Sequence, residues 1–160
     1  MKLESVHLFG LPGLVNVGRV TGVVYRGADP DPADGYRSLS DLGVKTVLNL
    51  SHGRDNEGLK PYGITEIYTP MNFFSDVDAG RIRELVSLLS DVNLYPIYVH
   101  CAQGRDRTGM VVACYRIESG WSNKDAIDEM WSFGFHAVWS HFLDFVRGYE
   151  RSQPPTIGGI

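Results

Sequence analysis

A cysteine and an arginine stand close together in the segment His100-Cys-Ala-Gln-Gly-Arg-Asp-Arg-Thr-Gly109. A cysteine thiolate is a strong nucleophile, and Arg107 lies six residues after Cys101, across one tight loop. The planar guanidinium of an arginine can hold two phosphoryl oxygens at once, which an ammonium group cannot copy. The segment therefore predicts a phosphate-binding loop with Cys101 as nucleophile and Arg107 as clamp.

The segments on either side of this loop suit anion binding. The apolar run Pro96–His100 predicts a strand, and Thr108–Ser119, apolar almost all round, predicts a buried helix. The amides of the loop and of the first helical turn then direct positive partial charge at one point, which stabilises an anion or a thiolate. Gly104 and Gly109 permit the tight backbone that such a loop requires.

The remaining loop residues are expected to surround the phosphate: Ala102, Gln103, Gly104, Arg105, Asp106 and Thr108. Thr108 is expected to donate its hydroxyl to the cysteine sulfur, and His100 to support the loop through a backbone hydrogen bond. Arg26 is expected to be a structural ion-pair partner, with a contact to the substrate rim as the alternative. The expected reaction is in-line attack by sulfur, a cysteinyl-phosphate intermediate, and hydrolysis by water. It requires no metal ion and no organic cofactor.

The pattern His-Cys-x5-Arg-Thr-Gly resembles the signature loop of the protein tyrosine phosphatase superfamily. Other stretches are similar to its small bacterial dual-specificity-like members: Val24–Ala28, Gly43–Leu50, Gly120–Ser122 and Phe133–His136. The resemblance extends from Val20 to His136. It implies a shallow site that accepts phosphotyrosine and also phosphoserine or phosphothreonine.

The resemblance also implies an aspartate, upstream of the cysteine, that protonates the leaving group. The segment Asn72–Asp78 lies in the expected place, after a predicted strand and before a predicted helix. Within it we favour Asp76, because Asp78 stands where a helix N-cap is wanted. Asp106 is a rival, since Arg105-Asp-Arg107 resembles the loop of phosphoinositide-directed members in which an aspartate has been assigned the acid role. Asp76, Asp78 and Asp106 therefore all remain candidates.

Three functions are consistent with these residues. The favoured one is a phosphomonoester hydrolase acting on a phosphorylated protein or a small phosphomonoester, with phosphotyrosine as the main substrate. The second is a phosphatase of inositol phosphates or phosphoinositides, indicated by Arg105 and Asp106. The third is an adaptor that binds phosphate without turnover, although the intact Cys101 and Arg107 speak against it. The sequence determines neither the physiological substrate nor the oligomeric state.

The alternation of apolar runs and amphipathic stretches predicts one α/β domain over residues 1–151, followed by a flexible tail, Ser152–Ile160. The expected sheet has four or five mostly parallel strands with helices on both faces, and the site lies at the carboxyl end of a strand. Strands are expected at 23–25, 45–50, 64–71 and 96–100, and helices at 33–42, 78–91, 108–119 and, twice more, after Ser122. The first 22 residues are expected to be irregular, and 51–63 to form a loop.

The composition narrows the class of protein further. The chain has 160 residues with 43% hydrophobic and 21% charged residues, which is typical of a soluble globular domain. Its net charge of −4 argues against a general nucleic-acid binder, which needs a basic excess. No apolar run predicts a membrane span, and no signal peptide is visible. Two cysteines are too few for a disulfide framework, so a cytoplasmic location is expected, with Cys114 as a core residue.

Overall fold

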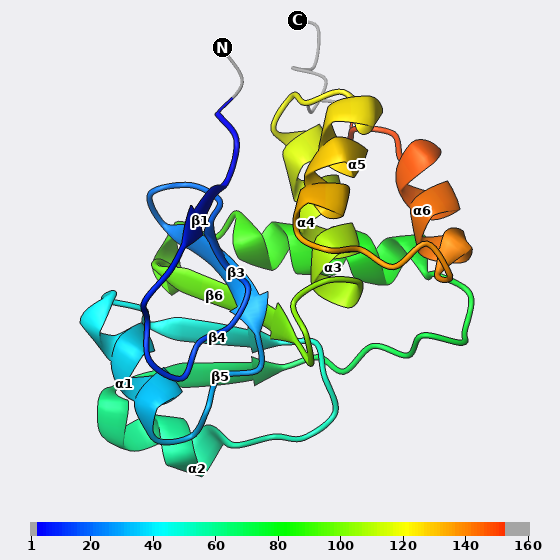
Figure 1. Cartoon of the computed structure of the whole chain (residues 1–160). Helices are drawn as coiled ribbons and strands as arrows, with labels where there is room; N and C mark the ends of the chain where they lie inside the picture. Colours follow the sequence, from blue (N-terminus) through cyan, green and yellow to red (C-terminus); the bar gives the residue numbers. More distant parts are fainter. Residues whose placement is uncertain (1–2, 153–160) are drawn as a thin grey trace, which may run out of the picture.

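The computed structural model of the chain describes residues 3–152. A six-stranded sheet runs through its centre in the order β1-β2-β3-β6-β4-β5 (Figure 1). The strands are β1 (Val6–Leu8), β2 (Val17–Arg19), β3 (Val24–Ala28), β4 (Thr46–Asn49), β5 (Thr65–Tyr68) and β6 (Ile97–Cys101). The last four are parallel to one another, whereas β1 and β2 are antiparallel additions beside β3. The strands β3, β4 and β6 are buried throughout, as expected of parallel strands covered on both faces.

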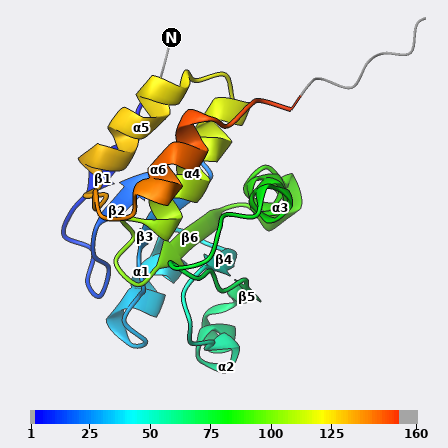
Figure 2. The ribbon, with the colours of Figure 1, turned by 90° about the vertical axis from the view of Figure 1, so that its right-hand side faces the viewer.

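Helices cover both faces of this sheet (Figures 1 and 2). One face carries α1 (Asp34–Asp41), α2 (Asn56–Leu59) and the short 3-10 helix η1 (Lys60–Tyr62). The other carries α3 (Ala79–Leu89), α4 (Arg107–Glu118), α5 (Asn123–Ser132) and α6 (Ser140–Arg147), and a second 3-10 helix, η2 (Val92–Leu94), follows α3. Helix α4 packs against α3, α5 and α6 at once, which explains why its sequence is apolar almost all round.

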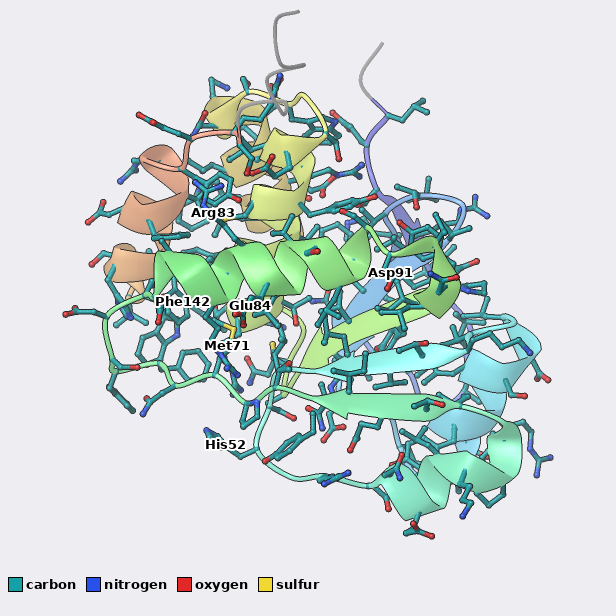
Figure 3. The ribbon with its side chains drawn as sticks, turned by 180° about the vertical axis from the view of Figure 1, so that it is seen from behind. His52, Met71, Arg83, Glu84, Asp91 and Phe142 are labelled. Atoms are coloured by element: carbon teal, nitrogen blue, oxygen red, sulfur yellow. The ribbon has the colours of Figure 1, made fainter. Side chains whose placement is uncertain are left out.

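The two layers of helices enclose two hydrophobic clusters, one on each side of the sheet. Val99 of β6 belongs to the larger cluster with Met110 and Phe142, and its neighbour Tyr98 belongs to the smaller cluster with Leu39. Successive strand residues point to opposite faces of a sheet, so one central strand supplies both clusters. Figure 3, the view from behind, shows α3 in front of the sheet and above the chain that carries Met71.

The predicted fold class is confirmed: the chain forms one α/β domain with a mostly parallel sheet and helices on both faces. Two parts of the prediction were wrong. The sheet has six strands, because segments 6–8 and 17–19, expected to be irregular, pair as β1 and β2. These strands have three residues each and are too short to show an alternating pattern.

The second correction concerns residues 51–63, which were expected to form a loop. They contain α2 and η1, and the Asp55 side chain caps α2 by accepting a hydrogen bond of 3.1 Å from the Gly58 amide. Such short helices are stabilised by caps and packing, and the glycines and charges in this stretch hide them from pattern analysis.

At the C-terminal end, Ser152 donates hydrogen bonds from its amide and its hydroxyl to Glu118. The other residues of the predicted tail, 153–160, lie outside the described part of the chain. Within residues 3–152, no helix is long and apolar enough to cross a membrane.

Candidate active site

The loop that joins β6 to α4 contains the predicted phosphate site. Cys101 is the last residue of β6, and Arg107 is the first residue of α4. Both side chains are nearly enclosed, with exposed fractions of 2% and 4%. Because β6 lies between β3 and β4, the loop emerges from the middle of the sheet at the carboxyl edge of its parallel strands.

A cavity of about 410 Å³ lies over this loop. Part of its lining is apolar and consists of Phe73, Val138 and Trp139. The rest is formed by His136 and the loop residues Cys101, Ala102, Gln103, Asp106 and Arg107. The structure thus brings the predicted nucleophile and the predicted clamp together in one cavity large enough for a phosphate and part of its leaving group.

The Arg107 guanidinium is fixed on one side only. Its Nη1 donates hydrogen bonds to the carbonyls of Leu50 (3.4 Å) and Met71 (3.2 Å), and its central carbon lies 4.3 Å from the Phe73 ring centroid. Its Nε is buried but has no hydrogen-bond partner among the described residues. A buried charged donor without a partner costs free energy, so this group is suited to receive an anion.

His100 supports the loop as predicted. Its Nδ1 lies 3.3 Å from the carbonyl oxygen of Cys101 and 3.8 Å from Asp29 Oδ1. Burial lowers the pKa of His100 to about 4, and the charge of Arg107 lowers this pKa too, whereas the Cys101 hydrogen bond acts in the opposite direction. The imidazole is therefore neutral at pH 7 and donates its Nδ1 proton to the Cys101 carbonyl.

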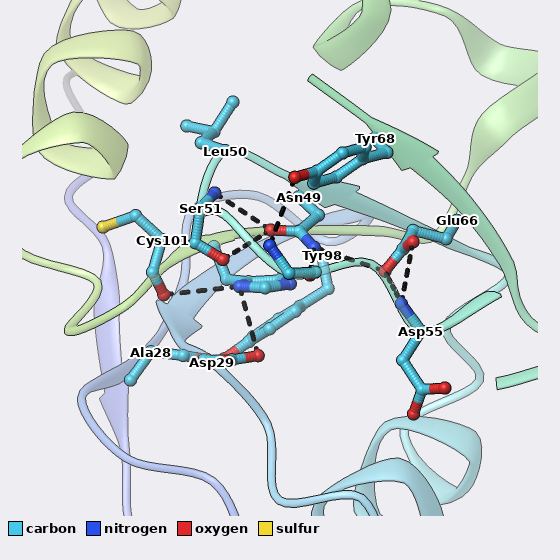
Figure 4. Close-up of polar contacts among 12 residues, drawn as sticks. Ala28, Asp29, Asn49, Leu50, Ser51, Asp55, Glu66, Tyr68, Tyr98 and Cys101 are labelled. Carbon is cyan, nitrogen blue, oxygen red and sulfur yellow. Dashed lines mark hydrogen bonds and ion pairs between the residues drawn. The ribbon is translucent and has the colours of Figure 1, made fainter. Parts of the chain in front are cut away.

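A polar network continues along the ends of the neighbouring strands (Figure 4). Asn49, the last residue of β4, accepts hydrogen bonds from the amide and the hydroxyl of Ser51 and donates one to Glu66. Glu66 in turn accepts one from the Asp55 amide at 3.2 Å. The network holds the chain just after β4, where the Leu50 carbonyl accepts a hydrogen bond from Arg107, the predicted clamp.

Asp106 is bound to His136, a residue for which the sequence predicted no contact in the site. The two Asp106 carboxylate oxygens lie 2.8 Å from the His136 amide nitrogen and 2.8 Å from its Nδ1. Asp106 itself is buried, and Arg105 Nη1 lies 3.5 Å from His136 Nε2. The signal for His136 in the sequence is its place in the Phe133–His136 stretch, which carries no chemical pattern of its own.

The favoured acid, Asp76, does not line the cavity over Cys101. It is exposed in the segment between β5 and α3, and it lines a second cavity of about 220 Å³ with Met71 and Arg81 among others. Asp78 caps α3, as expected, by accepting a hydrogen bond of 3.2 Å from the Arg81 amide. Of the three candidate acids, the structure brings Asp106 alone into contact with the cavity that holds the cysteine.

One expected contact is not formed, and another residue has a different partner from the one expected. The Thr108 hydroxyl is buried but makes no hydrogen bond with any described residue, and so none with the Cys101 sulfur. Thr108 already belongs to α4, and the helical backbone sets the direction of its side chain. Arg26 is structural, as favoured, and does not reach the substrate rim. It is fully buried, it stacks on the Phe133 ring at 4.0 Å, and its Nη2 donates to the Gly104 carbonyl at 3.1 Å, where an ion pair was expected.

The two cysteines differ in their surroundings. Both are free thiols, but Cys114 lies inside α4 within the larger hydrophobic cluster, as predicted for a core residue. Burial raises the pKa of the Cys114 thiol well above its ordinary value, so that it stays protonated. Cys101 instead lines a cavity beside an arginine.

The profile of the tyrosine phosphatase family matches residues 13–154. The dual specificity protein phosphatase TpbA of Pseudomonas aeruginosa is 31% identical over 122 residues, which cover 76% of this chain and 56% of that protein. The inositol diphosphatase DSP5 of Arabidopsis thaliana is 28% identical over 134 residues, covering 81% and 58%. The chain thus spans little more than half the length of these curated relatives.

Solved structures of similar proteins share the fold of this chain. The crystal structure of P. aeruginosa TpbA superposes with a TM-score of 0.75 at 28% identity and covers 87% of this chain and 92% of that one. The catalytic domain of the PP-IP phosphatase SIW14 from S. cerevisiae has the same fold, with a TM-score of 0.79 at 23% identity and coverage of 88% and 89%. The family match spans strands β2 to β6, the cysteine loop and the helices that follow it, and the chain belongs to the tyrosine phosphatase family.

Proposed function

We propose that this chain is a phosphomonoester hydrolase that forms a cysteinyl-phosphate intermediate on Cys101 and acts on phosphotyrosine, and also on phosphoserine or phosphothreonine. The observation that carries the proposal is the meeting of two groups in one cavity. The thiol of Cys101 ends a central strand, and Arg107 beside it has an anchored Nη1 and a buried Nε without a partner among the described residues.

In the proposed reaction, the Cys101 sulfur attacks phosphorus in line with the departing oxygen, and water later cleaves the S–P bond. Arg107 and the loop amides hold the equatorial phosphoryl oxygens, where negative charge develops. Asp76 remains our proposed proton donor, and it reaches the leaving group if the segment 72–78 moves toward the cavity. The rival Asp106 is less suited to this role because His136 occupies both of its carboxylate oxygens.

The apolar part of the cavity supports an aromatic leaving group. Phe73 and Trp139 pack with ring centroids 4.4 Å apart and their planes tilted by 31°, and Phe74 beside them is 86% exposed. Such side chains can pack against the phenol ring of phosphotyrosine. An inositol phosphate is polar and highly charged, and it gains little from an apolar wall. The solved structure of TpbA in complex with phosphotyrosine, 27% identical to this chain with a TM-score of 0.73, supports the same substrate class.

A second candidate, an inositol phosphate, is favoured by one feature of the rim. Arg105 and His136 lie 3.5 Å apart next to the loop, and Arg105 is exposed. Together they can donate hydrogen bonds to a second phosphate group of the same substrate. Inositol diphosphatases from plants are among the relatives of this chain. Because either reaction needs a free thiol at Cys101, we also propose a reducing, cytoplasmic location.

The deciding experiment compares a phosphotyrosine peptide, a phosphothreonine peptide and an inositol phosphate as substrates of wild type, Cys101→Ser and Cys114→Ala. We expect the peptides to be hydrolysed faster than the inositol phosphate, no turnover by Cys101→Ser, and full turnover by Cys114→Ala apart from a loss of stability. A serine hydroxyl stays un-ionised and cannot replace the thiolate. Turnover by Cys101→Ser contradicts the mechanism, and faster hydrolysis of the inositol phosphate favours the second candidate. Binding by wild type without any turnover favours an adaptor.

A further inference from the structure

The phosphate loop is held in shape by donors that lie outside residues 101–107. Four consecutive loop carbonyls, those of residues 101–104, each accept a hydrogen bond from such a donor. The pairs are His100 Nδ1 with Cys101 O (3.3 Å), the Asp29 amide with Ala102 O (3.2 Å), Asn16 Nδ2 with Gln103 O and Gly104 O (both 3.3 Å), and Arg26 Nη2 with Gly104 O (3.1 Å). Each of these carbonyl oxygens is thus directed at an external partner.

This pattern fixes the direction of the loop amides. The C=O and N–H of one planar trans peptide unit point in opposite directions, so a carbonyl held outward turns the next N–H inward. The amides of residues 103–105 share their peptide units with the carbonyls of residues 102–104. Those amides donate to no residue within the described part of the chain, although the loop is otherwise densely bonded. Successive free amides that converge in this way form an anion-binding concavity.

Asn16 makes the largest number of these external contacts. Its Nδ2 also donates to the Phe133 carbonyl at 3.0 Å, so that one amide group joins the loop to the end of α5. All three partners are carbonyl oxygens, which identifies the facing atom as nitrogen. Among residues 3–152, Asn16 is also the one non-glycine residue with a positive φ, at 53°. Asparagine tolerates this conformation better than most residues, and such strain is retained where the surrounding structure demands it.

Arg26 reinforces the same point of the loop. Burial lowers its pKa to about 10, while nearby Glu129 and Cys101 oppose that shift, so the guanidinium remains charged at pH 7. It stacks on the ring of Phe133, the residue whose carbonyl receives the Asn16 amide. Gly104 has a φ of 69° and packs so closely against Gly27 that no side chain would fit between them. The Gly104 peptide is therefore clamped from several directions.

We propose that Asn16 is a positioning residue of the phosphate loop: its amide holds the Gln103 and Gly104 carbonyls outward and thereby directs the loop N–H groups at a bound phosphoryl group. The proposal rests on the proposed function, because a phosphoryl group is the ligand it assumes. Asn16 lies 85 residues before Cys101 and would act through the loop backbone without touching the reacting atoms.

The test is Asn16→Gly, which retains the left-handed backbone and removes the amide. The matched control is Asn123→Gly. Asn123 Nδ2 also donates to three carbonyls, those of Val146 (2.9 Å), Arg147 (3.3 Å) and Tyr149 (2.8 Å), but it joins α5 to the end of α6. Both variants lose the same kind and number of hydrogen bonds, so a general loss of stability affects both.

Two measurements report on the loop itself. One is the inhibition constant of orthovanadate, and the other is the pH midpoint for alkylation of Cys101 by iodoacetamide. For Asn16→Gly we expect vanadate to bind about tenfold more weakly, because the loop loses two hydrogen bonds. We also expect the pH midpoint of alkylation to rise. Asn123→Gly should leave both within about twofold of wild type while lowering Tm. Asn16→Asp, which keeps the size but removes the donor, should repeat the effect of Asn16→Gly and covers the case in which the glycine variant does not fold.

Unchanged vanadate binding and an unchanged alkylation midpoint in a folded Asn16 variant overturn the proposal, as does an equal effect in Asn123→Gly. Failure of wild type to bind vanadate or hydrolyse any phosphomonoester contradicts the proposed function instead. In that case the alkylation midpoint still tests whether Asn16 shapes the loop around Cys101.

Discussion

Two loops that the proposed reaction needs are built in opposite ways. In the phosphate loop, four consecutive carbonyls are bonded to outside donors, and the side chains of Cys101 and Arg107 are buried. The segment 72–78 is attached near its two ends. The Phe73 carbonyl accepts a hydrogen bond of 2.6 Å from His141 Nε2, and Asp78 caps α3. Between these points, Phe74 and Asp76 are exposed.

The difference indicates that the two loops meet different requirements of the proposed reaction. Groups that stabilise developing charge are effective when they are oriented before the substrate arrives, so the phosphate loop is fastened from many sides. A proton donor has to approach a leaving group whose size varies, and a segment fixed only at its ends can adapt. Variants of the two loops should therefore behave differently.

The largest effect is expected in the fastened loop. Arg107→Lys should lower kcat/KM by on the order of 10³ while leaving the fold intact, because a lysine retains the charge but loses the planar pair of donors. Steady-state kinetics with a phosphotyrosine peptide, together with circular dichroism, measures both quantities. A loss of only two- or threefold would show that the clamp lies elsewhere.

Asp76→Asn should have the next largest effect, and it should depend on the leaving group. We expect kcat to fall by on the order of 10² for alkyl or unactivated aryl phosphates and to change little for an activated aryl phosphate that departs without a proton. The alkaline limb of the pH–rate profile should flatten as well. Asp78→Asn is the control, since asparagine caps a helix about as well as aspartate. If Asp106→Asn reproduces the leaving-group dependence and Asp76→Asn does not, then Asp106 is the acid.

A smaller effect, on stability, is expected from the buried histidine below the phosphate loop. The pKa of His100 is about 4 in the folded chain and about 6.5 in an unfolded one, so the unfolded chain binds more protons as the solution becomes acidic. Its contribution is complete above pH 6.5 and decreases as the pH falls toward 4. When the pH falls from 6.5 to 5, the protonation of His100 in the unfolded chain should lower the free energy of unfolding of wild type by about 1.5 kcal/mol.

Urea unfolding of His100→Asn at these two pH values checks this expectation, because asparagine can donate to the Cys101 carbonyl without titrating. His52→Asn is the control, since His52 is exposed on the loop after β4 (Figure 3). An equal loss of stability in wild type and His100→Asn would contradict the assignment of the effect to His100.

The smallest effect is expected at the tip of the segment 72–78. Phe74→Ala should raise KM for an aryl phosphate by about two- to fivefold, because Phe74 and Trp139 lie edge to face at 5.6 Å beside the cavity. It should not change the affinity for vanadate, which has no leaving group. Phe9→Ala is a matched control, since Phe9 is equally exposed, at 86%, but its ring contacts His7 and not Trp139, the cavity residue that Phe74 contacts. An equal change in both variants would exclude a contact between Phe74 and the leaving group.

The sequence predicted those features that are encoded over a short stretch. The strand, the loop and the helix around Cys101 occupy consecutive residues, so their order could be inferred from one motif, and the proposed nucleophile and the proposed clamp come from the same motif. The strands β1 and β2 could not, because three residues carry no periodicity. Nor could the hydrogen bonds of Asn16, Arg26 and His136, whose partners lie between 30 and 117 residues away. Spacing along the chain says nothing about such contacts.

The long reach of these contacts has a consequence for folding. The strand order places β3 beside β6, and the loop carbonyls are bonded to residues from near the start of the chain. Contacts between residues so far apart close large loops, and the entropy lost in closing them is offset only when those contacts have formed. An anion held by the loop therefore binds the native state and not partly folded chains, and it raises the free energy of unfolding by RT ln(1 + [L]/Kd). Anion binding at the phosphate loop is in this way thermodynamically linked to the stability of the whole domain.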